Sequence, residues 1–125
     1  MPVPIAIALG GALGSWLRYV VATGVTDRAG VIGAGTFAVN VVGAFILGLV
    51  FGLIEARFPE TPRWVGSGIS IGVLGGFTPF SSYTLDAFRQ VEEGRWPLAI
   101  AYVLGTVVLG LLAAVGGIAL GRSAG

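Results

Sequence analysis

Cysteine, histidine and lysine are absent from this chain of 125 residues. Without cysteine there is neither a disulfide framework nor thiol chemistry, and without histidine the chain lacks the commonest metal ligand and general base. All seven cations are arginines, and because they form no basic run, nucleic-acid binding is not expected. The formal net charge of +1 points to no particular class of partner.

Charge of either sign is scarce. Only 10% of the residues are charged, against about 25% in an average soluble domain, and 55% are hydrophobic. Four apolar segments lie at 3–23, 31–55, 63–89 and 96–120, each close to the ~20 residues that cross a ~30 Å hydrocarbon core. The sequence therefore predicts an all-α integral membrane protein, with a single four-helix transmembrane domain over residues 1–125 in a lipid bilayer.

Glycine is abundant, with 22 residues, and many of them recur four apart. The repeated positions are Gly10/Gly14, Gly48/Gly52, Gly68/Gly72/Gly76 and Gly117/Gly121. Small residues at this spacing let helices approach closely in lipid. We interpret most of them as packing positions rather than as parts of a binding site.

The third apolar segment cannot be one regular helix, because residues 75–83 read GGFTPFSSY. Adjacent glycines weaken a helix, and Pro79 has no backbone N–H to donate. Thr78 before Pro79 is typical of an N-cap followed by proline at the first helical position. We predict one helix ending near Gly75 and another starting at Thr78, broken at mid-membrane. Irregular backbone at that depth is tolerated only inside protein or beside a cavity, so this break is a candidate site.

The arginines give no preferred orientation in the membrane. Four crossings place both termini and the second connection on one side of the membrane. That side carries Arg57, Arg63 and Arg122, and the other carries Arg28, Arg89 and Arg95. Since a bias is needed to set orientation, the count predicts dual topology, with two copies associating antiparallel. The alternative is that Arg18 or the N-terminal amine sets a single orientation.

A few polar residues interrupt the apolar segments. Arg18 either extends its charge to the membrane surface or places a positive charge at the mouth of an anion path. Asn40 lies four residues after Thr36 on the same helix face, and could serve a helix–helix hydrogen bond or an ion. Tyr102 and Thr106 repeat this spacing, although Tyr102 could also be a packing residue.

In the broken segment, Phe80 and Tyr83 share a helix face, and Ser81 and Thr84 share an adjacent one. Plain core packing is the alternative for Phe80. No acidic residue lies deep in an apolar segment, and because a proton-coupled carrier usually needs one, a passive path is favoured. Hydroxyls, an amide, aromatic edges and arginine suit a small anion.

Together these motifs resemble the Fluc fluoride channel family, also called CrcB, over nearly the whole chain. The resemblance rests on the glycine-rich stretch ending in Arg18-Tyr19, on Thr36 with Asn40, on the 75–81 block, and on Tyr102 with Thr106; the middle two blocks are the specific ones. It implies a four-helix subunit in an antiparallel, dual-topology homodimer with two fluoride pathways. It also implies a bacterial inner-membrane location, where fluoride leaks passively out of the cytoplasm and its toxicity is relieved.

The resemblance also implies site residues. It maps the ion pathway onto Asn40, Phe80, Tyr83, Thr36, Tyr102 and Thr106. To these we add Ser81 for its hydroxyl and Arg18 for its charge, as further predicted residues of the pathway. A structural sodium ion at the dimer centre would be held by the backbone carbonyls of Gly75 and Thr78. Three positions depart from the family pattern: Pro79 replaces a usual threonine, Tyr83 replaces a phenylalanine, and Gly110 replaces the last hydroxyl.

Three alternatives remain open. Some members of this family are heterodimers of two diverged chains, although the balanced arginine count favours a homodimer. A small dual-topology multidrug exporter has a similar size, but its first helix carries an acidic residue and 3–23 has none. A non-transporting membrane assembly subunit would use its glycines only for packing. None of these proteins is an enzyme.

Overall fold

The computed structural model describes residues 1–78 and 80–124, the side chain of Ser81 excepted. Every regular element within these residues is helical. The helices are α1 (Val3–Ala29), α2 (Ala34–Ala56), α3 (Arg63–Ser67), the π-helix η1 (Gly68–Leu74), α4 (Gly75–Phe77), α5 (Phe80–Glu92) and α6 (Trp96–Ser123). Because α3, η1 and α4 follow one another without a gap, the chain builds an all-helical bundle from the four predicted segments.

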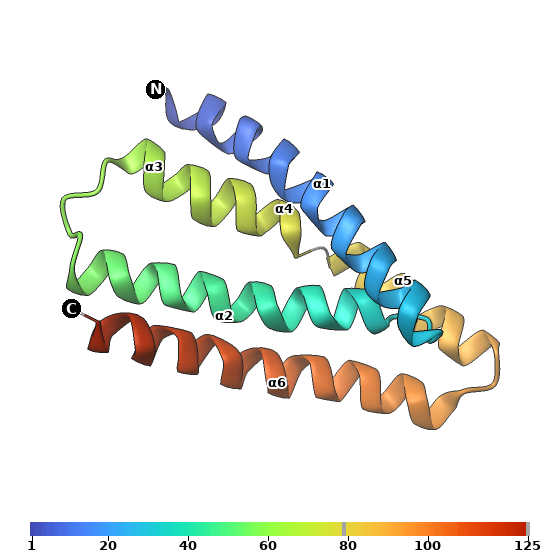
Figure 1. Ribbon diagram of the computed structural model, residues 1–125. Coiled ribbons are helices and arrows are strands. Elements are labelled where there is room, and N and C mark those ends of the chain that lie inside the picture. The colour runs from blue at the N-terminus through green and yellow to red at the C-terminus, as the bar shows by residue number, and fades with distance from the viewer. Residues whose placement is uncertain (79, 125) are drawn as a thin grey trace.

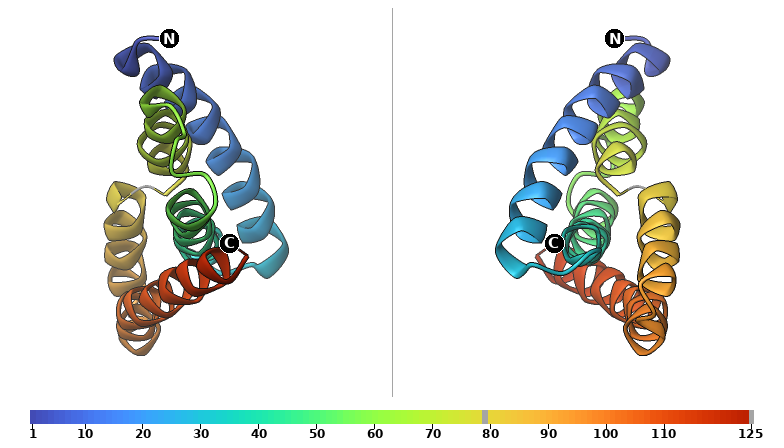
Figure 2. Two further views of the ribbon diagram at one scale, coloured as in Figure 1. Left: turned by 90° about the vertical axis from the view of Figure 1, so that its left-hand side faces the viewer. Right: turned by 90° about the vertical axis from the view of Figure 1, so that its right-hand side faces the viewer.

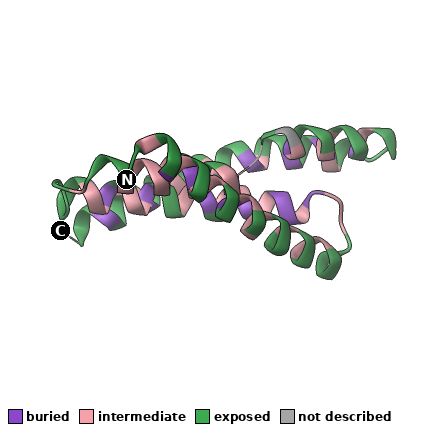
Figure 3. Ribbon diagram, turned by 90° about the horizontal axis from the view of Figure 1, so that it is seen from above, coloured by how far each residue is buried: buried purple, intermediate pink, exposed green. Residues whose placement is uncertain are grey.

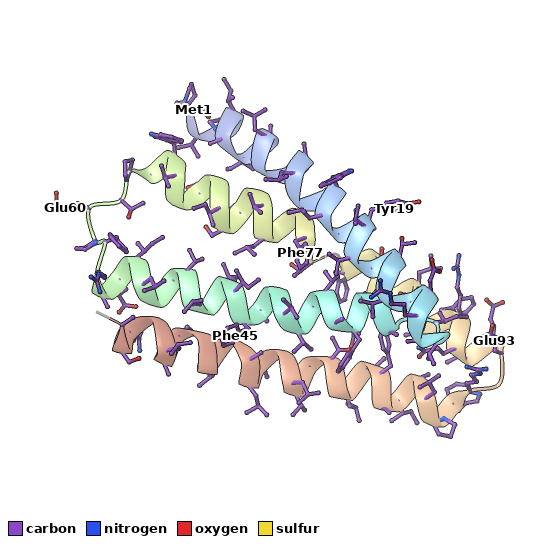
Figure 4. All side chains as sticks on the ribbon, in the orientation of Figure 1. Met1, Tyr19, Phe45, Glu60, Phe77 and Glu93 are labelled. Carbon is purple, nitrogen blue, oxygen red and sulfur yellow. The ribbon has the colours of Figure 1, made fainter. Side chains whose placement is uncertain are left out.

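The bundle is elongated, with its connections at two opposite ends. Both termini and the connection from α2 to α3 lie at one end, and the connections from α1 to α2 and from α5 to α6 lie at the other (Figure 1). Glu60 and Glu93 mark these two ends (Figure 4). Helices α1, α2 and α6 are each long and apolar enough to cross a membrane.

Two helices run farther than the sequence predicted. Helix α1 was expected to end at residue 23 but continues to Ala29, and α6 continues past residue 120 to Ser123. Gly30 ends α1 in the left-handed conformation, with its N–H donating to the Thr26 carbonyl at 2.8 Å. Hydropathy marks the residues that suit hydrocarbon, whereas the backbone hydrogen bonds continue until a capping residue stops them.

The bounds around the third segment also differ from the prediction. The helical run continues beyond Gly75 to Phe77, and α5 begins at Phe80. Thr78 has φ −111° and ψ 87°, outside the helical region. Its hydroxyl donates backwards to the Leu74 carbonyl at 2.9 Å, so it closes the preceding helix. The predicted role of Pro79 at the first position of the next helix lies outside the described residues.

Glycines bring two pairs of helices into backbone contact, as predicted. Helix α1 packs on η1 and α4, where a methyl group added to Gly72 would lie 2.8 Å from the Ile7 carbonyl oxygen. Helix α2 packs most extensively on α6, where one added to Gly121 would lie 2.5 Å from the Leu49 oxygen. Helix α5 lies on one side of α2 and α1 on the other (Figure 2). The glycine pattern therefore sets which faces meet.

The outside of the single chain is apolar. Few residues are buried, and they follow the lines where helices meet (Figure 3). Large side chains such as Leu111 and Val115 on α6 are 64% and 65% exposed. A surface of this kind is stable against lipid or against another apolar protein surface, and not in water.

Candidate functional site

A hydroxyl–carboxylate pair joins α2 to α5. Thr36 lies in the first turn of α2 and is buried, and its hydroxyl donates to Oδ2 of Asp86 at 2.8 Å. Asp86 is half-buried, because its position on α5 turns it toward the bundle. The predicted pathway residue Thr36 is therefore hydrogen-bonded to a carboxylate that sequence reasoning had placed near a segment end.

Three aromatic rings continue this cluster. The Tyr83 ring lies 5.2 Å from that of Tyr102 and 5.8 Å from that of Phe80, between ring centroids. Tyr83 is buried, and its hydroxyl donates to the Val103 carbonyl at 2.7 Å, which ties α5 to α6. Phe80 is 71% exposed. Phe80 and Tyr83 thus share a helix face, with one ring inside the subunit and the other on its surface.

The two predicted pathway residues of α6 use their hydroxyls differently. Both are buried. The Thr106 hydroxyl donates to the Tyr102 carbonyl at 2.6 Å, within its own helix. The Tyr102 hydroxyl is enclosed and lies within reach of the Thr36 side chain, but it makes no hydrogen bond of ordinary length to a described group. Of the two hydroxyls, that of Tyr102 is the more weakly held, with the Thr36 side chain beside it.

A second group of predicted residues surrounds a hollow of about 190 Å³ between α2 and the run from η1 to Thr78. Asn40, Gly75 and Thr78 all line it, together with Ser70. The Ser70 hydroxyl donates to a carbonyl of its own helix. Asn40, which is half-buried, therefore brings a side-chain amide to the helix end at which Gly75 and Thr78 lie.

Helix α2 connects the cluster around Thr36 and Asp86 to the hollow lined by Asn40. Arg18 belongs to neither group. Thr36 and Asn40 are one helical turn apart, so the carboxylate cluster and the hollow are adjacent. Arg18 is half-buried on α1, and its Nε is enclosed without a partner among the described residues. No described hydrogen bond or ion pair brings Arg18 into either group. The predicted role of Ser81 rests on a side chain outside the described residues.

Sequence reasoning missed two polar residues on α5. Asp86 follows Tyr83 by three positions and Gln90 follows Asp86 by four, so all three share one helix face. Gln90 is 1% exposed, and its Nε2 donates to the Ile32 carbonyl at 2.7 Å. The spacing of these three residues in the sequence could have predicted their shared face. It was overlooked because Asp86 and Gln90 lie near the end of the apolar segment.

The arrangement suits binding of a small anion better than covalent chemistry. Asn40 and Tyr102 supply donors, and ring edges carry partial positive charge. Among the described residues, no three acidic, histidine or cysteine side chains gather to hold a metal ion.

The fold and these two groups define a multi-pass membrane protein with polar side chains enclosed between its helices. The profile of the family described as "CrcB-like protein, Camphor Resistance (CrcB)" matches residues 5–118. The chain belongs to this family.

Curated relatives match over nearly their full length. A protein of Pseudomonas fluorescens is 41% identical over 123 residues, covering 96% of this chain and 97% of the relative. A protein of Pseudomonas syringae pv. tomato is 40% identical over 119 residues, covering 94% and 95%. A protein of Maridesulfovibrio salexigens is 42% identical over 118 residues, covering 93% and 92%. Each is named "Fluoride-specific ion channel FluC", so the family is one of ion channels and not of enzymes.

Proposed function

We propose that this protein is a fluoride channel that lets fluoride leave the bacterial cytoplasm passively across the inner membrane and so relieves its toxicity. The observation that carries the proposal is the match, at about 40% identity over nearly the whole chain, to relatives named as fluoride-specific channels. The two polar groups agree with it, because they offer hydrogen-bond donors inside an otherwise apolar bundle.

Fluoride is small and strongly hydrated, so a pathway must replace the donors of water at close range. The Tyr102 hydroxyl is buried and makes no hydrogen bond of ordinary length to a described group, and the Asn40 amide lines the hollow beside the end of α4. Ring edges of Phe80 and Tyr83 would add partial positive charge. The hydroxyls of Thr36 and Thr106 already donate; they would turn toward the ion only by exchanging those bonds.

Charge would act at longer range. Arg18 would raise the local concentration of anions near the pathway. Asp86 has the opposite sign, and its carboxylate accepts the Thr36 hydrogen bond. Passive transport was inferred from the lack of acidic residues deep in the apolar segments, and the inward-facing carboxylate of Asp86 weakens that argument. We therefore add a control: release that stops when a protonophore collapses the proton gradient would indicate a proton-coupled carrier.

We propose further that the working unit is an antiparallel homodimer of dual topology. Phe80 is exposed on the single chain although it belongs to the predicted pathway, and a second copy would enclose it. The balanced arginines at the two ends of the bundle support insertion in both orientations. A diverged partner chain remains the alternative. Crosslinking of single-cysteine variants near Phe80, in cells that lack any related chain, would yield a covalent homodimer if the proposal is correct.

We also propose a structural sodium ion at the end of α4, where backbone carbonyls could hold it. Pro79 has no N–H, so the Gly75 carbonyl lacks its usual helical donor. Gly75 is exposed on the subunit surface, and Thr78 lies just beyond the helix end. Carbonyl oxygens suit a hard cation, and a two-fold axis would bring the same pair from a second copy. The ion would supply fixed positive charge and hold two subunits together.

Growth of a fluoride-sensitive bacterium tests the function in cells. Expression of this chain should restore growth in fluoride, and the Asn40→Asp variant, expressed and assembled to the same level, should not. An assembly subunit without transport activity predicts no rescue by either chain. A multidrug exporter predicts resistance to organic cations in place of fluoride, and either result would overturn the proposal.

A further inference from the structure

Gln90 is the most deeply buried polar side chain of the described residues, with 1% of its surface exposed. Its Nε2 donates to the Ile32 carbonyl at 2.7 Å, which fastens α5 to the connection in front of α2. This bond also sets the orientation of the amide, because turning it over would place two oxygens against each other. The Oε1 atom therefore points elsewhere, and it is buried with no hydrogen-bond partner among the described residues.

The Tyr102 hydroxyl is also enclosed; the Thr36 side chain lies within reach of it, but no described group makes a hydrogen bond of ordinary length with it. Both side chains meet over Gly33, which has φ +90°. A methyl group added to Gly33 would lie 2.9 Å from Gln90 Nε2 and 2.9 Å from Cε2 of Tyr102. The amide and the phenol ring are therefore close neighbours, and the missing side chain of Gly33 leaves room for both.

The chemistry of the two atoms limits what can satisfy them. Gln90 Oε1 only accepts hydrogen bonds, whereas the Tyr102 oxygen both accepts and donates. An anion would satisfy the phenol but would be repelled by the amide oxygen, and a hard cation needs about six oxygen ligands where only these two are available. A water molecule carries two donors, one for each oxygen. Buried waters typically occur where polar groups have no other partner.

We propose that Gln90 is a positioning residue of the ion pathway, and that one buried water bridges its Oε1 to the Tyr102 oxygen. The water donates to both oxygens, so the phenolic proton stays free to turn toward the pathway on the side of Thr36. A hydroxyl that accepts one hydrogen bond is also a stronger donor in the next. This inference rests on the proposed function, since it assigns Tyr102 to the passage of fluoride.

A double-mutant cycle on fluoride release from liposomes tests the positioning role. Gln90→Met and Tyr102→Phe should each lower the release rate by about fivefold to tenfold, the value of one hydrogen bond. The double variant should match Tyr102→Phe within about twofold, because both changes act through one hydroxyl. Phe88→Met, an exposed position on the same helix, should release fluoride at the wild-type rate. A wild-type rate for Gln90→Met, or losses that multiply in the double variant, would overturn the proposal.

A crystal structure of the wild-type protein tests whether the bridging water exists, and it does not depend on the folding of any variant. It should show one ordered water within hydrogen-bonding distance of Gln90 Oε1 and the Tyr102 oxygen. Direct contact between the two groups, or no water there while other buried waters are resolved, would refute the bridge. If the wild type releases no fluoride, the proposed function fails, and the crystal structure still decides whether the bridge exists.

Discussion

Replacing one of two adjacent glycines on α6 should separate helix packing from helix propensity. A methyl group added to Gly117 would overlap the Phe45 carbonyl oxygen and lie 2.8 Å from the Leu49 nitrogen, both in the backbone of α2. A methyl group added to Gly116 would meet nothing within 4 Å. Gly117→Ala is therefore the perturbation and Gly116→Ala its matched control.

The two variants share one stabilising effect and differ in one destabilising effect, and this sets the expected difference in their free energies of unfolding. Both gain the helix propensity of alanine over glycine, up to about 1 kcal/mol. Only Gly117→Ala must push two backbones apart, and overpacking of this kind costs about 1–3 kcal/mol. Gly116→Ala should therefore be as stable as the wild type or slightly more so, and Gly117→Ala should be less stable than its neighbour by about 1–3 kcal/mol.

Thermal unfolding in a mild detergent measures this difference. For a chain of this size, 1 kcal/mol shifts Tm by several degrees, so the two variants should differ by about 3 °C or more. The fluoride release rate of Gly116→Ala, measured on the same preparation, should equal that of the wild type. Equal Tm values for the two variants would refute the close approach of α2 and α6.

Three further substitutions test the candidate pathway. Asn40→Asp should suppress fluoride release, because a carboxylate repels the anion where an amide donates a hydrogen bond, and the dimer should still form on crosslinking. Release at the wild-type rate would exclude Asn40 from the pathway. Tyr83→Phe should keep the fluoride release rate within about twofold of wild type, because the lost hydroxyl donates to the Val103 carbonyl. It should lower the free energy of unfolding by about 1 kcal/mol. A tenfold lower release rate would show that this hydroxyl contacts the ion. Thr36→Val should destabilise by about 1–3 kcal/mol in denaturant titrations, because Asp86 loses its described donor; unchanged stability would contradict the described hydrogen bond.

Much of the architecture could be predicted from the sequence because it depends on local physical properties. Apolar length determines how many helices there are. Glycines spaced four apart determine which faces meet, and Gly72 and Gly121 lie at backbone contacts, as expected. Helix ends were less predictable, since Ala29 lies well beyond the apolar segment and only the conformation of Gly30 stops α1.

The site was only partly predictable, because side-chain partners depend on helix rotation. The shared face of Phe80 and Tyr83 follows from their spacing. The bond from Thr36 to Asp86 joins residues fifty positions apart, and no local pattern encodes it. Hydropathy assigned Asp86 to a segment end, whereas packing against α2 turned it inward. Whether these residues conduct an ion is still a prediction.

Fluoride release from liposomes is the most direct test of the central claim. Vesicles loaded with both fluoride and chloride, and carrying the purified protein, are diluted into a medium free of both ions. Two ion-selective electrodes then follow the same suspension after a potassium ionophore is added to balance charge. The proposed function predicts rapid release of fluoride with chloride retained, and no change in rate on adding a protonophore. Release of chloride without fluoride, or no release beyond that of empty vesicles, would contradict it.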